Sequence, residues 1–359
     1  MKQYIPVLSI RPSEVVALAE LPDIAKDRMT PLVLIKPWLG TGALSRAVDK
    51  IHHGFANRPW YAELDPDYEP DDTSESFDEI AELRDPADGF VKWLSYVETQ
   101  SKAIPVIQLR GADPDSLDRQ TKRAMDLGRG ICVRIPRSSY LPLEPILDVI
   151  ARNTENCDII LDYGQQSSRL LVNIIPARTD VFAVKRRLPN SSIAISATTF
   201  PSSFTNINSQ EIFERQFFDQ LCAAAGDYTL RFSDRGSARA SDRSGGGVPR
   251  PRIDLPSPEN WFFFRSDCVR EEGEAVEEFR ERRIEAYQDM AAAAVASDAW
   301  DEKLNIWGTQ LIKITQLGNE YGITSPAKAT SCRINIHMTV QSLFGEAING
   351  EQLEEDWVD

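Results

Sequence analysis

The chain opens with the apolar run YIPVLSI at residues 4–10, continues with SEVVALAEL at residues 13–21, and reaches a second apolar run, LVLIK, at residues 32–36. The first and third runs are short and rich in β-branched residues, which is typical of buried strands. In the middle run, Val15 and Leu18 recur at helical spacing behind Ser13, which suits a helix N-cap. Strand, helix and strand in this order predict a parallel pair joined by a right-handed crossover.

The same alternation continues along the chain. Six further apolar runs are expected to form strands, at residues 60–64, 104–109, 131–135, 158–161, 193–197 and 228–232. Amphipathic stretches lie between them, at residues 43–53, 90–97, 115–127, 143–150, 168–175 and 211–224, and a long charged helix is expected at 269–296. Repeated strand–helix units close most economically into a barrel, so we expect an α/β fold of the (β/α)8 TIM-like class. An open doubly wound sheet is disfavoured, because no glycine-rich phosphate loop follows the first strand.

Three segments depart from this repeat. Residues 65–88 contain eleven acidic residues and a single base, Arg84, and are expected to form a solvated insertion. Residues 235–252 are expected to form a basic, glycine-containing loop, followed by an extra hairpin that includes NWFFFR at 260–265. We therefore predict a barrel over residues 1–298 and a C-terminal helical extension over residues 299–359, packed on the barrel.

Composition limits the class of protein. The formal net charge of −15 disfavours nucleic-acid or anionic-membrane binding over the whole surface. The sequence has neither an apolar run of transmembrane length nor a signal-peptide layout at its start, so we expect a cytoplasmic protein without a membrane partner. Five scattered cysteines without a CxxC pair argue against a disulfide framework and a zinc ribbon. No metal or other cofactor is predicted, although a carboxylate-only Mg²⁺ site stays open.

Function in such barrels lies at the C-terminal ends of the strands. The sequence is expected to bring several bases there, beginning with Arg11 after the first strand. The predicted ligand-binding bases are Lys36, Arg110, Arg134, Arg137, Arg231 and Arg265. Buried arginines must be paired or bind an anion, and a guanidinium group fits phosphate well. We therefore predict a site for a phosphate-bearing ligand, either a nucleotide or a nucleic acid. The structural alternative is ion pairing with the nearby acids, which are Glu63, Asp65, Asp162 and Asp234.

Two other functions fit the sequence. The acidic segment 65–88 or the C-terminal extension could dock a protein partner, which would make the chain a non-catalytic interaction subunit. Alternatively, Asp65, Asp162 and Asp234 could hold Mg²⁺ and hydrolyse a phosphodiester, with Glu63 as a further catalytic candidate. The scarcity of histidine weighs against this enzyme hypothesis, because the chain has only three. Whether the protein is an enzyme stays open at this point.

Four sets of segments resemble the beta protein family of bacteria and phages. They are YIPVLSIRPSEVVALAEL with TPLVLIKP (4–21 and 30–37), ATTFPSSF (197–204), GDYTLRFSDRG (226–236), and WGTQLI with CRINIHM (307–338). The resemblance implies no assigned activity, but a phage or mobile-element setting, and hence a part in antiviral defence or counter-defence. It marks six family positions of unknown role, namely Phe200, Pro201, Gly226, Asp227, Tyr228 and His337. Members tend to have an acid on the second strand, where this chain has Lys36, so an activity that depends on that acid would be lost or changed here.

Overall fold

The computed structural model describes residues 4–38, 44–71, 76–137, 142–240, 249–346 and residue 353. Its internal contacts divide the chain into two compact units. The first consists of Met1–Arg11, Met29–Phe200 and Phe213–Ser241, and the second of Pro12–Arg28, Pro201–Ile212 and Asp242–Asp359. Each unit is assembled from separate segments, so neither coincides with the continuous ranges 1–298 and 299–359, which stay a prediction.

The first unit is built on a sheet of parallel strands. Its members are β1 (Tyr4–Ser9), β2 (Leu32–Ile35), β3 (Trp60–Leu64), β4 (Ala103–Pro105), β5 (Cys132–Pro136), β6 (Asp158–Gln165), β7 (Ser192–Thr198) and β9 (Leu230–Asp234). They are ordered β4-β3-β2-β1-β9-β7-β6-β5. A parallel bridge between Val106 and Cys132 links the two edges, and the Ile107 amide donates to the Cys132 carbonyl at 2.9 Å. The predicted TIM-like α/β barrel is thus confirmed.

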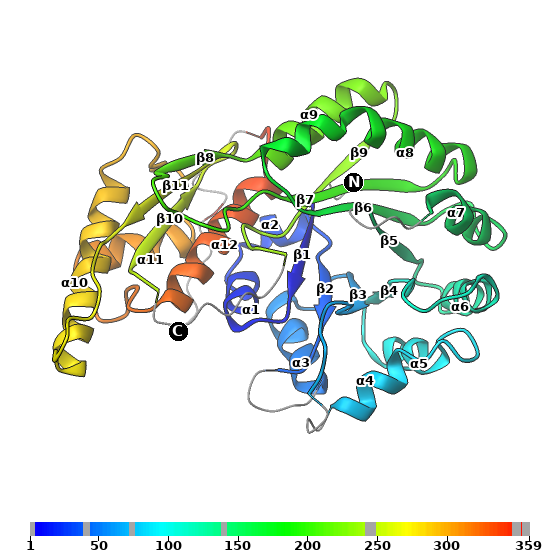
Figure 1. Cartoon of the computed structure of the whole chain (residues 1–359), viewed down its shortest axis with the longest axis horizontal. Helices are drawn as coiled ribbons and strands as arrows, with labels where there is room; N and C mark the ends of the chain where they lie inside the picture. Colours follow the sequence, from blue (N-terminus) through cyan, green and yellow to red (C-terminus); the bar gives the residue numbers. More distant parts are fainter. Residues whose placement is uncertain are drawn as a thin grey trace. The chain divides into compact units, whose positions relative to one another are not determined.

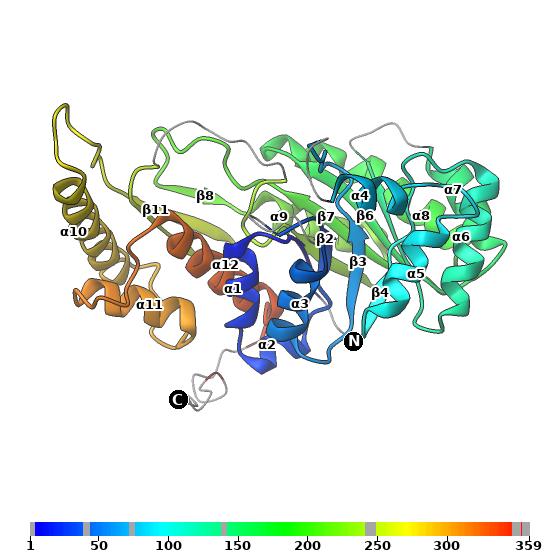
Figure 2. The same cartoon turned by 90° about the horizontal axis from the view of Figure 1, so that it is seen from below.

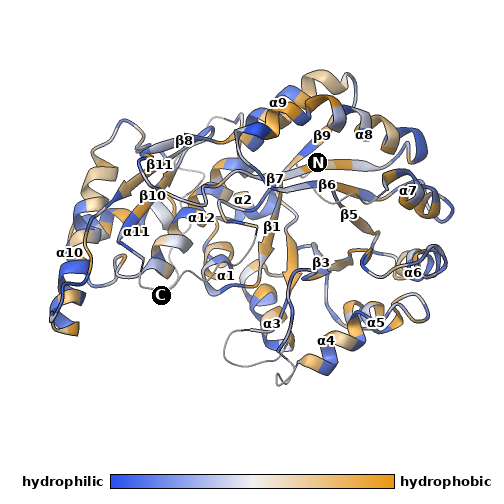
Figure 3. Ribbon diagram, viewed as in Figure 1, coloured by the Kyte–Doolittle hydropathy of each residue, from blue (hydrophilic) through white to orange (hydrophobic). Residues whose placement is uncertain are grey.

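Helices follow the strands and lie outside them (Figure 1). They are α3 (Leu44–Phe55), α4 (Phe77–Leu83), α5 (Val91–Thr99), α6 (Pro114–Asp126), α7 (Leu143–Ala151), the 3₁₀ turn η1 (Ser168–Asn173), α8 (Ile174–Arg187) and α9 (Phe213–Ala225). Figure 3 shows hydrophobic residues along the strands and alternating colours along these helices, as expected for one apolar face per helix. Helix α4 was not expected within the acidic segment. It forms because Ile80 and Leu83 provide a buried face.

The barrel interior contains an apolar layer in its middle. Ile160 and Ala194, which pair across β6 and β7, belong to a buried cluster with inward side chains from the other strands. Side chains of a strand alternate between faces, so residues two positions before and after this layer also point inward. On β6 these residues are Asp158 and Asp162. The apolar layer therefore separates a charged position near the N-terminal ends of the strands from another near the C-terminal ends.

The second unit contains a small antiparallel sheet and a helical core. Strands β10 (Arg252–Pro256) and β11 (Asn260–Arg265) form the predicted hairpin, and β8 (Ser209–Glu211) adds a third strand. The helices are α1 (Pro12–Ala19), α2 (Asp23–Asp27), α10 (Val276–Val295), α11 (Trp307–Gln316) and α12 (Pro326–Ser342). Every residue of α12 from Ser331 onward is buried. Strand β8 was not expected because its residues, Ser-Gln-Glu, are polar and not buried.

Two helical predictions need correction. The helix expected at 269–296 begins only at Val276, and its Tyr287 packs with Ile253 and Ile336 in the core of the second unit, so it is not a barrel helix. The helix expected at 13–21 forms as α1, but it also belongs to the second unit. There the Asn335 side-chain amide donates to the Ala17 carbonyl at 3.2 Å. Figure 2 shows α1 beside α12. Among the described residues, no helix has both the length and the apolar character required to cross a membrane.

Candidate functional site

Four charged side chains meet inside the barrel toward the C-terminal ends of the strands. We call Glu63, Arg134, Asp162 and Arg235 the C-terminal charged layer. Arg134 donates from Nε and Nη2 to both carboxylate oxygens of Glu63, at 2.6 and 2.7 Å, and from Nη1 to Asp162 Oδ2 at 2.6 Å. Arg235 donates from Nη2 to the same Asp162 oxygen at 3.0 Å. The layer therefore joins β3, β5 and β6 to the residue that follows β9.

The layer is almost completely shielded from water. The side chains of Asp162, Arg134 and Arg235 are 3%, 5% and 7% exposed. Burial raises the pKa of Glu63, and the Arg134 guanidinium only partly offsets this. Burial acts in the same direction on Asp162, but Arg235, Arg134 and the Gly164 amide outweigh it, so the pKa of Asp162 is lowered. Burial also works against the charge of Arg134, but its carboxylate partners raise its pKa above the usual value. Asp162 and Arg134 therefore stay charged at neutral pH.

Two polar atoms of this region lack a hydrogen-bond partner among the described residues. They are Ser196 Oγ and Arg235 Nε, and both are buried. Ser196 pairs in register with Asp162 on β6, so it faces the barrel interior. A buried hydroxyl without a partner costs free energy, and a bound ligand that supplies an acceptor removes this cost.

Lys36 and Asp65 add two further charges at this end. Lys36 Nζ lies 3.8 Å from Asp65 Oδ2, and the two side chains are 13% and 8% exposed. Asp65 Oδ1 accepts the Asp67 amide at 3.0 Å, which holds the carboxylate in place as β3 ends. Lys36 is thus next to the C-terminal charged layer in the same sheet, because β2 pairs with β3.

Two other predicted bases lie at the rim instead. Arg110 is exposed and donates to the Pro66 carbonyl and to Glu69, at 2.6 and 3.0 Å. Arg137 forms a two-point contact with Asp180 on α8, at 2.8 and 3.1 Å.

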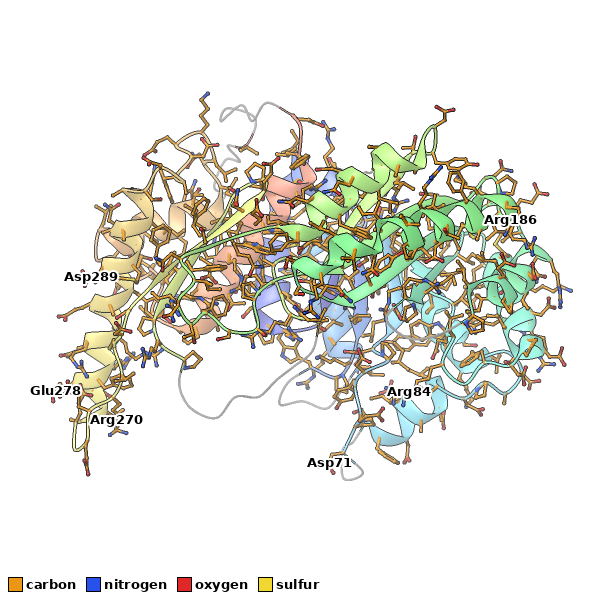
Figure 4. The ribbon with its side chains drawn as sticks, turned by 45° about the horizontal axis from the view of Figure 1, so that its top comes forward. Asp71, Arg84, Arg186, Arg270, Glu278 and Asp289 are labelled. Carbon is orange, nitrogen blue, oxygen red and sulfur yellow. The ribbon has the colours of Figure 1, made fainter. Side chains whose placement is uncertain are left out.

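The acidic segment after β3 is anchored by its one base. Arg84, labelled in Figure 4, donates to the Asp65 carbonyl at 3.0 Å and to the Tyr68 carbonyl, and its guanidinium lies 3.5 Å from Glu69.

Arg231 lies at the opposite end of the barrel interior. We call Tyr61, Asp158, Ser192 and Arg231 the N-terminal charged layer. Arg231 Nη1 donates to Asp158 Oδ1 at 2.9 Å and to Ser192 Oγ at 3.0 Å, while Nη2 donates to the Tyr61 hydroxyl at 3.1 Å. The strand expected at 228–232 begins only at Leu230, so Arg231 is near its start rather than its end. The structure therefore does not bring Arg231 together with Arg134.

Of the four candidate acids, Glu63 and Asp162 meet at Arg134, but Asp65 and Asp234 do not join them. Asp234 accepts the Tyr4 hydroxyl at 2.6 Å and the Gly236 amide at 2.8 Å. It alternates with the inward Ser233 and Arg235, so it lies on the outer face of β9. Asp65, Asp162 and Asp234 thus form no common site, and in the described part of the chain no group of three or more His, Cys, Asp or Glu side chains could hold a metal ion.

Sequence reasoning overlooked Arg235 as a site residue by assigning it to the basic loop. The sequence spacing could have identified it. Arg231, Ser233 and Arg235 are two positions apart from one another, so they share one face of β9 and its extension. Arg265 lies on β11 in the second unit, where it donates to the Phe204 carbonyl.

The positions marked by the family resemblance are spread over both units. In the first unit, Phe200 is buried and its carbonyl accepts the Gln165 side-chain amide at 3.0 Å. Gly226 directly follows α9 with φ of +69°, a left-handed conformation that glycine adopts without strain. Asp227 is exposed, and the ring of Tyr228 lies against Phe182 with centroids 5.6 Å apart.

The other two positions belong to the second unit. Pro201 is buried, and His337 is fully buried on α12 with its ring stacked on Trp261, at a centroid distance of 6.1 Å.

Comparison with known proteins confirms the family. The model of the family described as Beta protein matches residues 4–342. The chain is also similar to a curated protein named Protein beta from Enterobacteria phage P4, with 24% identity over 361 residues that cover 96% of this chain and 94% of that protein. Because the family match extends over nearly the entire sequence, this chain belongs to the Beta protein family.

Proposed function

We propose that this Beta protein family member binds a phosphate-bearing small molecule of the nucleotide class at the C-terminal end of its barrel. The observation that supports the proposal is the buried Ser196 hydroxyl, which has no hydrogen-bond partner in the described part of the chain and faces the C-terminal charged layer. In barrels of this class, ligands bind at this end of the strands.

The chemistry of the surrounding groups favours an acceptor-rich anion. Ser196 Oγ and Arg235 Nε are donors without a partner among the described residues. Lys36 Nζ, which lies 3.8 Å from Asp65 Oδ2, adds a further positive charge at this end. Arg134 and Arg235 already compensate the charges of Glu63 and Asp162. An incoming phosphate would therefore meet donors rather than uncompensated carboxylates.

Arg134 has a positioning role in this proposal. Nε, Nη1 and Nη2 are all engaged by Glu63 and Asp162, so its part is to hold the two carboxylates rather than to contact the ligand. The overall charge of −15 favours a small phosphate compound over an extended nucleic acid. Membership of a family with a phage P4 relative supports a biological setting in phage–host conflict.

A thermal-shift screen tests the proposal. We expect the melting temperature of the full chain to rise with one class among nucleoside mono-, di- and triphosphates and sugar phosphates, and to rise less at high salt. Lys36→Ala and Ser196→Ala should each reduce the rise.

Lys92→Ala is the matched control, because Lys92 is an exposed barrel lysine paired with Glu82 at 3.1 Å. No rise with any phosphate compound at low salt would refute the proposal. An equal rise in the wild type and in both site variants would refute it as well.

A further inference from the structure

A cavity lies on the outer side of the strands, at the N-terminal end of β3. It has a volume of about 130 Å³ and is bounded by the last turn of α3, the loop that follows it, the start of β3, and the loop before β4. Helix α3 lies beside β2 and β3 in both views (Figure 1, Figure 2). All of these segments belong to the first unit. The cavity is therefore separate from the C-terminal charged layer, which lies inside the barrel at the other end of β3.

The walls of this cavity are aromatic. Phe55 and His52 come from α3, and Trp60 is the first residue of β3. The imidazole of His52 meets the indole of Trp60 edge to face, with ring centroids 6.0 Å apart. A planar ring is the ligand that aromatic walls accommodate best, by stacking or by edge-to-face contact. An engineered cavity of about 150 Å³ binds benzene, so a cavity of this size suits a single ring.

Two side chains of this wall also contain a buried polar atom without a partner among the described residues. Trp60 is 1% exposed, and its Nε1 has no hydrogen-bond partner in the described part of the chain, nor has His52 Nε2. An indole N–H can only donate, so a ligand that satisfies it must supply an acceptor. The His52 ring can donate or accept at Nε2, depending on its tautomer. The unsatisfied pair thus favours a ring that bears an acceptor atom over a pure hydrocarbon ring.

The charges around the cavity have one sign. Arg58 and Lys102 are among its lining residues. All of the lining residues lie in the described part of the chain, and none of them is acidic. The Arg58 guanidinium lies over the Phe55 ring, 5.9 Å from its centroid. Two rim residues, Ala56 and Lys102, have left-handed backbone angles with φ of +31° and +62°. Such conformations are costly outside glycine and are concentrated at ligand clamps and functional loops.

We propose that this cavity binds a small monocyclic heteroaromatic carboxylate. The ring lies between Phe55 and Trp60, a ring nitrogen accepts from the wall, and the carboxylate is attracted to Arg58 and Lys102. The inference does not depend on the proposed function at the C-terminal end, because no residue is shared between the two sites.

Calorimetric titration of the full chain with three related probes tests this inference. The probes are pyridine-3-carboxylate, benzoate, which lacks the ring nitrogen, and pyridine, which lacks the charge. We expect pyridine-3-carboxylate to bind more tightly than benzoate by about three- to tenfold, the effect of one additional hydrogen bond. Trp60→Phe keeps an aromatic wall but removes the indole N–H, and should abolish the difference between the two acids.

Variants of α3 and of the rim supply the controls. His52→Gln should weaken binding of pyridine-3-carboxylate, whereas His53→Gln should not, because His53 is exposed and does not line the cavity. Lys102→Gly should weaken both acids but not pyridine. This variant is expected to fold, because Lys102 is exposed and its φ of +62° suits glycine. Lys102→Gly therefore still tests binding in this cavity if Trp60→Phe does not fold.

Two results would overturn the inference. One is the absence of binding by all three probes at concentrations up to about 10 mM, because a formed site should have a dissociation constant below this concentration. The other is binding that stays unchanged in His52→Gln and Lys102→Gly.

Discussion

The two ends of the barrel interior hold similar residues in different hydrogen-bonding states. At the N-terminal end, Arg231 is surrounded by Asp158 and by the hydroxyls of Tyr61 and Ser192, which all bond to it. At the C-terminal end, two arginines share Asp162, while the Ser196 hydroxyl bonds to neither. Nε of Arg231 and of Arg235 are both without a partner in the described residues, so the difference between the ends lies in the hydroxyls.

This difference separates a structural ion cluster from a candidate binding site. Buried charges are costly, and an arrangement that satisfies them with neighbouring hydroxyls closes the end of a barrel without needing a ligand. Ser192 and Ser196 lie on the same face of β7, four positions apart, yet only Ser192 bonds to an arginine. The comparison is consistent with a structural role for the N-terminal charged layer, and it supports the proposal that a ligand binds at the C-terminal charged layer.

The largest effect is expected from Arg134→Ala. Its removal leaves Glu63 and Asp162 buried with most of their compensation lost, which should lower the free energy of unfolding by about 3–5 kcal/mol. Urea unfolding followed by circular dichroism measures this loss. Arg186→Ala is the control, because Arg186 on α8, labelled in Figure 4, is exposed and pairs with Glu144 at the surface. Its effect should stay below about 1 kcal/mol, and equal losses in the two variants would contradict the importance of burial.

A second prediction concerns a buried carboxyl for which, unlike Asp162, no ion pair with an arginine is described. Glu214 on α9 accepts a hydrogen bond from the Thr199 hydroxyl, and burial raises its pKa to about 8. The folded state then binds more protons than the unfolded chain between about pH 4.5 and pH 8, so stability should fall as pH rises through this window. Between pH 6 and 7.5, the loss should be about 2 kcal/mol.

The isosteric variant Glu214→Gln isolates this contribution. It should reduce the slope of unfolding free energy against pH within that window and leave the slope below about pH 4 unchanged. Urea unfolding at a series of pH values provides the measurement. An identical slope in the wild type and the variant would show that Glu214 is already ionised when folded.

The smallest effect is expected from two serine substitutions on β7, which should change the free energy of unfolding in opposite directions. Ser192→Ala removes a hydrogen bond to Arg231 and should destabilise the protein by about 1 kcal/mol. Ser196→Ala removes a buried hydroxyl without a partner and should be neutral or stabilising by up to about 1 kcal/mol. Parallel urea unfolding of the two variants checks the contrast. A loss of stability in Ser196→Ala as large as that in Ser192→Ala would mean that both ends are equally structural.

Much of the fold was predictable because its signals are local. Apolar runs and amphipathic stretches predicted the succession of barrel strands along the chain, and NWFFFR predicted the extra hairpin. The predictions were weakest where tertiary contacts decide. Helices α1 and α10 form as local periodicity indicates, but each packs in the second unit rather than serving as a barrel helix. An amphipathic pattern indicates that one face of a helix is buried, but it does not indicate which part of the protein packs against that face.

The alternation of strands and helices, the barrel class and the membership of the Beta protein family could be read from the sequence. The pairing of side chains inside the barrel could not: Arg134 meets Glu63 from 71 positions earlier, whereas Arg231 meets Tyr61 at the opposite end. The cause is strand register. Periodicity shows which residues share a face, but a shift of one residue exchanges inward and outward side chains, and only the paired strands fix that choice.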